Sequence, residues 1–183
     1  MKKTYVFVSL LLTSLLFSGQ AKGQETTQNQ EIGFRTSSLS SFDIIYKKQK
    51  EENSYSRLRL ATGEIDIGTL APFNGSLSLG IAGGKENRQA LSDKLFFVTG
   101  YELMCTLRTS VVVEKPSFSI TPGIGVVLGF SYLASDKFLV GIETIPAASF
   151  KFGYSNNDVH VSDLNIRFAS TYAALFVAYR FSK

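Results

Sequence analysis

Residues 117–132 alternate between two kinds of side chain, and this period of two strongly limits what the chain can form. The even positions carry large, mostly apolar side chains, namely Phe118, Ile120, Pro122, Ile124, Val126, Leu128, Phe130 and Tyr132. The odd positions carry Ser, Thr and Gly, with Val127 as the one large exception. Successive residues of a strand point to opposite faces, whereas a helix repeats every ~3.6 residues. The pattern predicts one long strand between an apolar and a polar environment.

The same alternation recurs along the chain. It is clear in residues 75–84, 95–111, 138–154 and 172–181, and fainter in residues 32–47, 55–68 and 163–170. The alternation inverts near Gly63, which indicates a bulge or a kink. Several of these segments exceed ten residues, whereas a tilted membrane-spanning strand needs ~9–11 and an average globular strand has ~5–6.

Two long uncharged stretches, 67–84 and 116–135, have the length of transmembrane helices. Both contain proline and several glycines and are interleaved with Ser and Thr, which disfavour helix. Together with 15 Phe, 8 Tyr and 15 Gly, this favours an all-β chain. The predicted fold is an antiparallel up-and-down transmembrane β-barrel of about eight strands.

The sizes of the two faces indicate which one points inward. The polar face is small and carries scattered charges of both signs, which suits the narrow lumen of an eight-stranded barrel. A solvated outer surface would be denser in Lys and Glu. The predicted lumen charge network consists of Arg35, Asp43, Arg57, Arg59, Glu102, Arg108, Glu143, Lys151 and Arg180. Because buried charges must pair or stay hydrated, we hypothesise that Glu102 and Glu143 pair with some of these basic side chains.

Aromatic residues near the predicted strand ends are typical of interfacial girdles. The candidates are Phe34, Tyr46, Tyr101, Phe118, Tyr132, Phe138, Phe152, Tyr154, Tyr179 and Phe181. With both termini in the periplasm, the charged segments 47–54 and 85–93 are expected to be extracellular loops, and so is the short link 134–136. Residues 163–181 form either two strands or one bent strand. The second reading leaves seven strands, and since bacterial barrels have even numbers, we keep eight.

The first 23 residues have the layout of a cleavable signal peptide. Lys2 and Lys3 precede an apolar run from Val6 to Phe17, and Ala21-Lys22-Gly23 supplies small residues before a cleavage site. We therefore expect a signal peptide at 1–23, a short polar segment at 24–30 and the barrel at 31–183. Removing the three lysines lowers the net charge from +4 to +1. A nearly neutral chain without a basic cluster argues against nucleic-acid binding.

The sequence offers no convincing catalytic, cofactor or metal site. His160 is the single histidine, and it lies near Ser162 and Asp163 in what reads as a polar loop. Cys105, the single cysteine, falls on the predicted lipid face and reads as a small hydrophobic residue. One His and one Cys provide no zinc-type ligand pair, and the glycine-rich stretch 81–84 does not match a phosphate-binding loop.

The final strand Tyr172-Ala-Ala-Leu-Phe-Val-Ala-Tyr-Arg-Phe181, together with the signal peptide, resembles the small eight-stranded outer-membrane barrels of the OmpA/OmpX type. It is also similar to the outer membrane protein β-barrel domains of the Bacteroidota. The resemblance covers most of residues 31–183. The chain departs from it because Ser182 and Lys183 follow Phe181, where such barrels often end on Phe.

The resemblance implies a monomer in the outer membrane of a Gram-negative bacterium, in contact with membrane lipid and with the barrel insertion machinery. It implies a non-enzymatic structural or surface-interaction role, with a side-chain-filled lumen and a surface partner or ligand that the sequence does not identify. Two alternatives remain open. One is a soluble periplasmic barrel with Ile120, Ile124, Val126 and Leu128 lining an apolar ligand pocket. The other is a lipid-modifying barrel enzyme that uses His160.

Overall fold

The computed structural model describes residues 28–38, 41–61, 65–67, 74–112, 115–155, 158–167 and 173–182. These residues form β1 (Asn29–Ser38), β2 (Ser41–Glu51), β3 (Ser54–Ala61), β4 (Ile65–Ile67), β5 (Asn74–Ala90), β6 (Leu95–Val112), β7 (Lys115–Ser135), β8 (Phe138–Thr144), β9 (Ala147–Ser155), β10 (Asp158–Arg167) and β11 (Ala174–Ser182). Within these ranges no helix is long and apolar enough to cross a membrane. The signal peptide expected at 1–23 lies outside the described residues, and β1 begins at Asn29, two residues before the expected start of the barrel.

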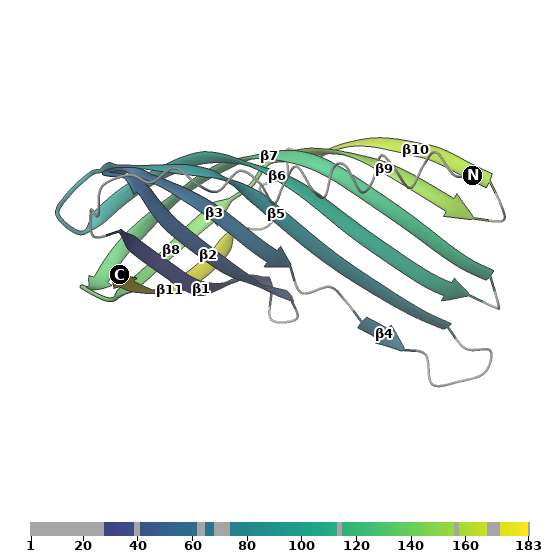
Figure 1. Ribbon diagram of the computed structural model, residues 1–183, viewed down its shortest axis with the longest axis horizontal. Coiled ribbons are helices and arrows are strands. Elements are labelled where there is room, and N and C mark those ends of the chain that lie inside the picture. Colours follow the sequence, from purple (N-terminus) through teal and green to yellow (C-terminus); the bar gives the residue numbers. More distant parts are fainter. Residues whose placement is uncertain are drawn as a thin grey trace.

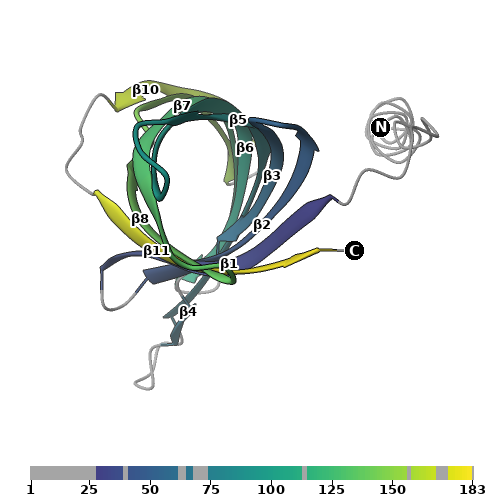
Figure 2. The same ribbon diagram turned by 90° about the vertical axis from the view of Figure 1, so that its left-hand side faces the viewer.

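Eight of the strands close into a ring of antiparallel pairs. The order around the ring is β1, β2, β3, β5, β6, β7, β8, β11 and back to β1. Figure 2 shows the ring nearly end-on, with β1 and β11 side by side where the sheet closes. The predicted fold, an all-β antiparallel barrel of about eight strands, is confirmed.

β8 and β9 act as one barrel strand that is interrupted at Ile145–Pro146. Both pair with β7, and the register is unchanged from Leu128↔Thr144 to Gly125↔Ala147 across the break. Pro146 has no N–H to donate, but its carbonyl still accepts a hydrogen bond from the Val126 amide at 2.9 Å. In the same way, β10 pairs with β9 and β11 pairs with β8, so these two segments form the eighth barrel strand.

The eight barrel strands differ from the predicted segments in two places. Residues 32–47 contain parts of two strands, since β1 and β2 form a hairpin. The described parts of residues 163–181 are the end of β10 and most of β11, which together occupy one position in the ring, whereas residues 168–172 between them lie outside the described residues. The extra strand at the start of the chain balances the missing one at its end, and the total stays at eight. The inversion near Gly63 falls outside the described residues.

The additional strand reverses the predicted placement of the charged segments. The first residue of β1 and the last residue of β11 pair with each other, and they lie at the same end of the barrel as the β2–β3, β5–β6 and β7–β8 turns. The segments 47–54 and 85–93 therefore lie beside the termini, not opposite them as predicted. Most of the second segment is strand, because β5 continues to Ala90. The short link after Ser135 also belongs to this end.

The outer surface of the barrel is apolar. Phe34 and Leu103 are 64% and 61% exposed, and many other large apolar side chains are also exposed. The exposed set includes eight of the ten predicted girdle aromatics, namely Phe34, Tyr101, Phe118, Tyr132, Phe138, Phe152, Tyr179 and Phe181. Tyr46 is half-buried and donates a hydrogen bond to Gln30. The side chain of Tyr154 is outside the described set.

The barrel wall is taller on one side. β5, β6, β7, β9 and β10 extend well beyond β1, β2 and β3, towards the right in Figure 1. β7 has 21 residues and pairs with β6 along almost its whole length, whereas β1 has 10. We call the extension formed by residues 74–79, 107–112, 115–120, 150–155 and 158–164 the tall wall. Its last strand, β10, pairs with β9 along one edge only within the described part of the chain.

Glycine allows neighbouring strands to approach closely at Gly84. A Cβ atom there would collide with the backbone of Tyr101 and Glu102 on β6. At the preceding position, Gly83, a Cβ would meet nothing within 4 Å, because that residue faces outward. The spacing between β5 and β6 thus requires glycine at position 84 but not at position 83.

Candidate functional site

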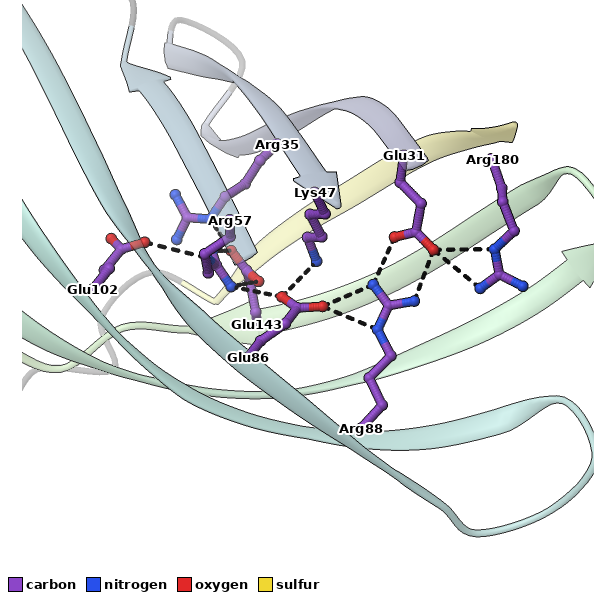
Figure 3. Close-up of polar contacts among 9 residues, drawn as sticks. All are labelled: Glu31, Arg35, Lys47, Arg57, Glu86, Arg88, Glu102, Glu143 and Arg180. Atoms are coloured by element: carbon purple, nitrogen blue, oxygen red, sulfur yellow. Dashed lines mark hydrogen bonds and ion pairs between the residues drawn. The ribbon is translucent and has the colours of Figure 1, made fainter. Parts of the chain in front are cut away.

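The barrel interior holds a dense set of charged side chains. Because neighbours on one face of a strand are two residues apart, each strand sends a short series of charges inward. β1 contributes Glu31 and Arg35, β2 contributes Asp43 and Lys47, and β3 contributes Arg57 and Arg59. β5 contributes Glu86 and Arg88, and β6, β8 and β11 contribute Glu102, Glu143 and Arg180. Figure 3 shows how most of these side chains converge from different strands.

Six of these residues form a closed ring of alternating charge. The ring runs through Arg57, Glu143, Arg35, Asp43, Arg59, Glu102 and back to Arg57. Its members come from β1, β2, β3, β6 and β8, so the ring ties together strands on opposite sides of the barrel. We call this set the ion ring.

Two guanidinium groups of the ion ring, those of Arg35 and Arg57, meet at the carboxylate of Glu143. Its carboxylate accepts hydrogen bonds from Arg35 Nε at 2.7 Å and from Arg57 Nη1 and Nη2 at 3.2 and 3.0 Å. Arg35 also donates to Asp43 at 3.0 Å. The Glu143 side chain is 1% exposed and that of Arg57 is fully buried. Both charges therefore depend on each other for compensation.

The other half of the ring is held by Arg59 and Glu102. Arg59 donates to Asp43 at 2.9 Å and also contacts Glu102. Glu102 in turn lies 3.4 Å from Nε of Arg57, an ion pair without hydrogen-bond geometry. Arg57 is thus in contact with Glu86, Glu102 and Glu143, which makes it the centre of the network.

A linear branch leaves the ring through Glu86. This carboxylate contacts Arg57 at 3.1 Å, Lys47 at 2.9 Å and Arg88 at 2.7 Å. Arg88 continues to Glu31 with hydrogen bonds of 2.8 and 2.6 Å, and Glu31 ends the branch on Arg180 at 3.0 Å.

Two aromatic rings support the cations of this branch. The Arg88 guanidinium lies 3.9 Å from the ring centroid of Tyr55, and Lys47 Nζ lies 4.4 Å from that of Phe176. Such cation–π contacts strengthen when the cation is removed from water. The branch therefore combines ion pairing with packing, and it fills the part of the lumen next to the ion ring.

The network is close to electrically balanced. Among the described residues it contains six basic and five acidic side chains, an excess of one positive charge. Burying charges costs several kcal/mol per ion, and only good geometry with several partners offsets this cost. Every carboxylate in the network has at least two basic partners, which meets that condition.

Seven of the nine predicted lumen charges lie in this network: Arg35, Asp43, Arg57, Arg59, Glu102, Glu143 and Arg180. Glu102 and Glu143 pair with arginines, and the structure supplies the partners that the sequence left open. Arg108 and Lys151 lie elsewhere. Both side chains are exposed on the polar inner face of the tall wall, beyond the level at which the ring closes.

The prediction missed Glu31, Lys47, Glu86 and Arg88. Lys47 has the same parity as Asp43, and Glu86 has the same parity as Gly84, so the alternation contained the signal. Lys47, Glu86 and Arg88 fall in the charged segments 47–54 and 85–93, whose composition is typical of loops. Their partners are remote, since Glu31 and Arg88 are 57 residues apart.

The described side chains include no group of three or more His, Cys, Asp or Glu residues able to hold a metal ion. Cys105 is a free, half-buried cysteine. The prediction that His160 lies in a loop is wrong, because its backbone belongs to β10 and pairs with Gly153. Val159 and Val161 flank His160, and such β-branched residues favour strand. Its side chain is outside the described set.

Two solved structures are similar to this chain. One is the crystal structure of Neisserial surface protein A (NspA), at 16% identity and a TM-score of 0.46, with 86% of this chain and 95% of that chain covered. The other is the N-terminal β-barrel domain of Pseudomonas aeruginosa OprF, at 11% identity and a TM-score of 0.45, with coverages of 85% and 97%. No protein-family model matches the chain, and no curated protein matches it. The resemblance to small eight-stranded barrels holds at the level of fold because the strands of this chain close into an antiparallel ring of eight.

Proposed function

We propose that the protein is a non-enzymatic β-barrel of the bacterial outer membrane whose lumen is closed by its own charged side chains. The observation that carries this proposal is the inverted distribution of polarity. Charged side chains such as Glu86 and Arg57 are buried inside, whereas Phe34, Leu103 and Leu175 are more than 60% exposed outside. A soluble barrel has the opposite arrangement, while a membrane barrel meets lipid with an apolar band.

The filled lumen supports a structural or surface-interaction role in preference to transport. An eight-stranded barrel leaves an interior just wide enough for side chains, and the ion ring spans it from β1 and β3 to β6 and β8. An open pore would require the ion pairs of this ring to break. We therefore expect the protein to conduct ions poorly and to act through its stability or through the end that faces the cell exterior.

The turns support one orientation. The β2–β3, β5–β6 and β7–β8 connections have two, four and two residues. At the other end the β1–β2 and β6–β7 connections also have two, but the link from β3 to β5, which contains β4, has twelve. Outer-membrane barrels have short periplasmic turns and longer extracellular loops, so we infer that the end where β1 begins and β11 ends faces the periplasm. The tall wall is then on the extracellular side.

The soluble alternative required an apolar interior lined by Ile120, Ile124, Val126 and Leu128. These side chains are 37–52% exposed on the outer surface, which contradicts that placement. The enzyme alternative depends on the side chain of His160, which the structure does not describe, and no described feature favours it.

The proposal is tested by mobility on a denaturing gel with and without heating. Closed barrels have no free edges in the ring and often stay folded in detergent until they are heated. We expect a band in the outer-membrane fraction whose mobility changes on boiling. A band in the soluble periplasmic fraction with no change on boiling would refute the proposal.

A further inference from the structure

The outer surface of the barrel carries two lysines at the border of its apolar band. Lys48 on β2 shares the even parity of Ile44, and Lys85 on β5 shares the odd parity of Ile81. Ile44 and Ile81 are 37% and 54% exposed on the outer surface, and residues two apart in a strand share a face. Both lysines therefore face outward, on the side of the band that is next to the β2–β3 and β5–β6 turns.

The two lysines flank Ser56 in one row of the sheet. Lys48 pairs with Ser56, and Ser56 pairs with Lys85, so the row crosses β2, β3 and β5, which are neighbours in Figure 1. Adjacent strands are ~4.8 Å apart, which places the two lysine Cα atoms about 10 Å from each other. Each ammonium ends a flexible four-carbon stem, and the serine between them is small. Both cations can thus reach a single anionic group above Ser56.

The two lysines have no acidic partner among the described residues. Neither forms an ion pair there, whereas the inward-facing neighbours Lys47 and Glu86 pair with each other inside the lumen. The next acidic residues along β2, Glu51 and Glu52, lie at the β2–β3 turn together with Lys50. All three of these turn residues are exposed, so three lysines lie near two carboxylates and the surface stays basic.

The apolar band has a gap directly beside Lys85. Gly83 lies on the same face of β5, one outward position further into the band, and a Cβ atom there would meet nothing within 4 Å. Gly83 pairs with Leu58 on one side and with Leu103 on the other, and these side chains are 49% and 61% exposed. A gap between two leucines, next to a pair of cations, matches an acyl chain below an anionic headgroup.

We propose that Lys48 and Lys85 bind the phosphate of an anionic phospholipid on the outer surface of the barrel, with one acyl chain over Gly83. This inference rests on the proposed membrane location, and the proposed orientation assigns the lipid to the periplasmic leaflet. Lysine stems lie along apolar surface while their ammonium groups reach the headgroups, and anionic lipids attract basic residues at the membrane surface. Tyr101, which pairs with Lys85 and is 53% exposed, is a residue type that favours the same level of the membrane.

The experiment is a lipid titration of the protein, purified from outer membranes in a neutral detergent, followed by native mass spectrometry. The probes are phosphatidylglycerol and phosphatidylcholine with identical acyl chains. We expect one phosphatidylglycerol to bind about tenfold more tightly than phosphatidylcholine, and the double variant Lys48→Gln/Lys85→Gln to lose this preference. Equal binding of the two lipids by the unaltered protein would overturn the inference, and so would a preference that survives in the double variant.

The matched control is Lys94→Gln/Lys137→Gln. It removes two exposed lysines from the β5–β6 and β7–β8 turns at the same end of the barrel, so the net charge changes equally. The preference should persist in this control, and its loss there would mean that net charge alone attracts the lipid. Millimolar inorganic phosphate should not displace the lipid, because full displacement would mean that the lysines bind free phosphate and would refute the assignment to lipid.

A third variant tests the position of the acyl chain. Gly83→Val fills the gap and should weaken the binding of both lipids about threefold while the preference between them remains. Unchanged binding in this variant would refute the placement of the chain over Gly83.

Each sample is first checked for the mobility change on heating. A folded barrel without lipid preference refutes only this inference, whereas a protein without barrel behaviour refutes the proposed function. If the double variant does not fold, the single variant Lys85→Gln, whose exposed side chain lies outside the ion ring, should weaken the preference about threefold. An unchanged preference in that variant also counts against the inference.

Discussion

Replacing Glu143 by alanine tests whether the ion ring stabilises the barrel. The substitution removes three hydrogen bonds that the carboxylate accepts from Arg35 and Arg57. Removing one partner of a buried ion pair typically costs ~3–5 kcal/mol. Arg35 keeps Asp43, and Arg57 keeps two other carboxylates, so we expect the lower limit, a loss of about 3 kcal/mol in the free energy of unfolding.

The measurement is a urea titration of the folded barrel in lipid vesicles. The folded fraction is read from the band that changes mobility on heating. With a urea dependence of ~2 kcal/mol per M, the midpoint should fall by about 1.5 M in the Glu143→Ala variant. Asp136→Ala, at an exposed position in the β7–β8 turn, is the control and should change the free energy by less than ~0.5 kcal/mol.

A second substitution tests the pairing itself. If Arg35 and Glu143 stabilise the fold through each other, Arg35→Met should cost less free energy in the Glu143→Ala background than in the unaltered protein. The expected difference is at least ~1 kcal/mol. Strictly additive losses, or a Glu143→Ala midpoint that falls no further than the Asp136→Ala midpoint, would refute the claim that the ring stabilises the barrel.

Three further predictions address the network, the outer surface and the strand spacing. Arg57→Met should cost at least ~3 kcal/mol and raise single-channel conductance in planar bilayers, whereas Arg180→Met, which removes a more exposed group with one acidic partner, should do neither. Equal effects of the two would contradict the central role of Arg57. Val126→Lys places a charge on the apolar band and should destabilise the inserted barrel by ~2–4 kcal/mol in the urea titration. A midpoint unchanged from the unaltered protein would argue that lipid does not cover this face. Gly84→Ala should abolish the heat-dependent mobility change because its Cβ collides with the β6 backbone, while Gly83→Ala should leave it intact; a folded Gly84→Ala barrel would show that the strands can move apart.

The sequence predicted the fold well because the alternation is local. Whether a residue faces lipid or lumen depends on its parity within one strand, and the pattern in residues 117–132 shows this without knowledge of any neighbour. The hairpin between β1 and β2 was missed because the apolar positions Ile32, Phe34, Phe42 and Ile44 are all even and continue in phase across the turn.

The network could not be predicted in full because its contacts are not local. Glu31 and Arg180 are 149 residues apart and meet only because β1 pairs with β11. Glu86 and Arg88 lie in a charged, turn-like sequence, yet β5 continues through them because β3 and β6 supply partners on both edges. Tertiary pairing overrides local propensity at such positions.

The contact between the first and last described strands has a consequence for biogenesis. A nascent chain that lacks β11 cannot close its sheet. The edge of β1 that pairs with β11 then has no strand partner, and Glu31 lacks Arg180. The same chain, before β8 is added, also leaves Arg35 and Arg57 without Glu143. Partly assembled forms would thus expose both strand edges and unbalanced charge to lipid, where neither is tolerated. For a barrel in the proposed outer-membrane location, we therefore expect insertion into the membrane to follow synthesis of the whole barrel.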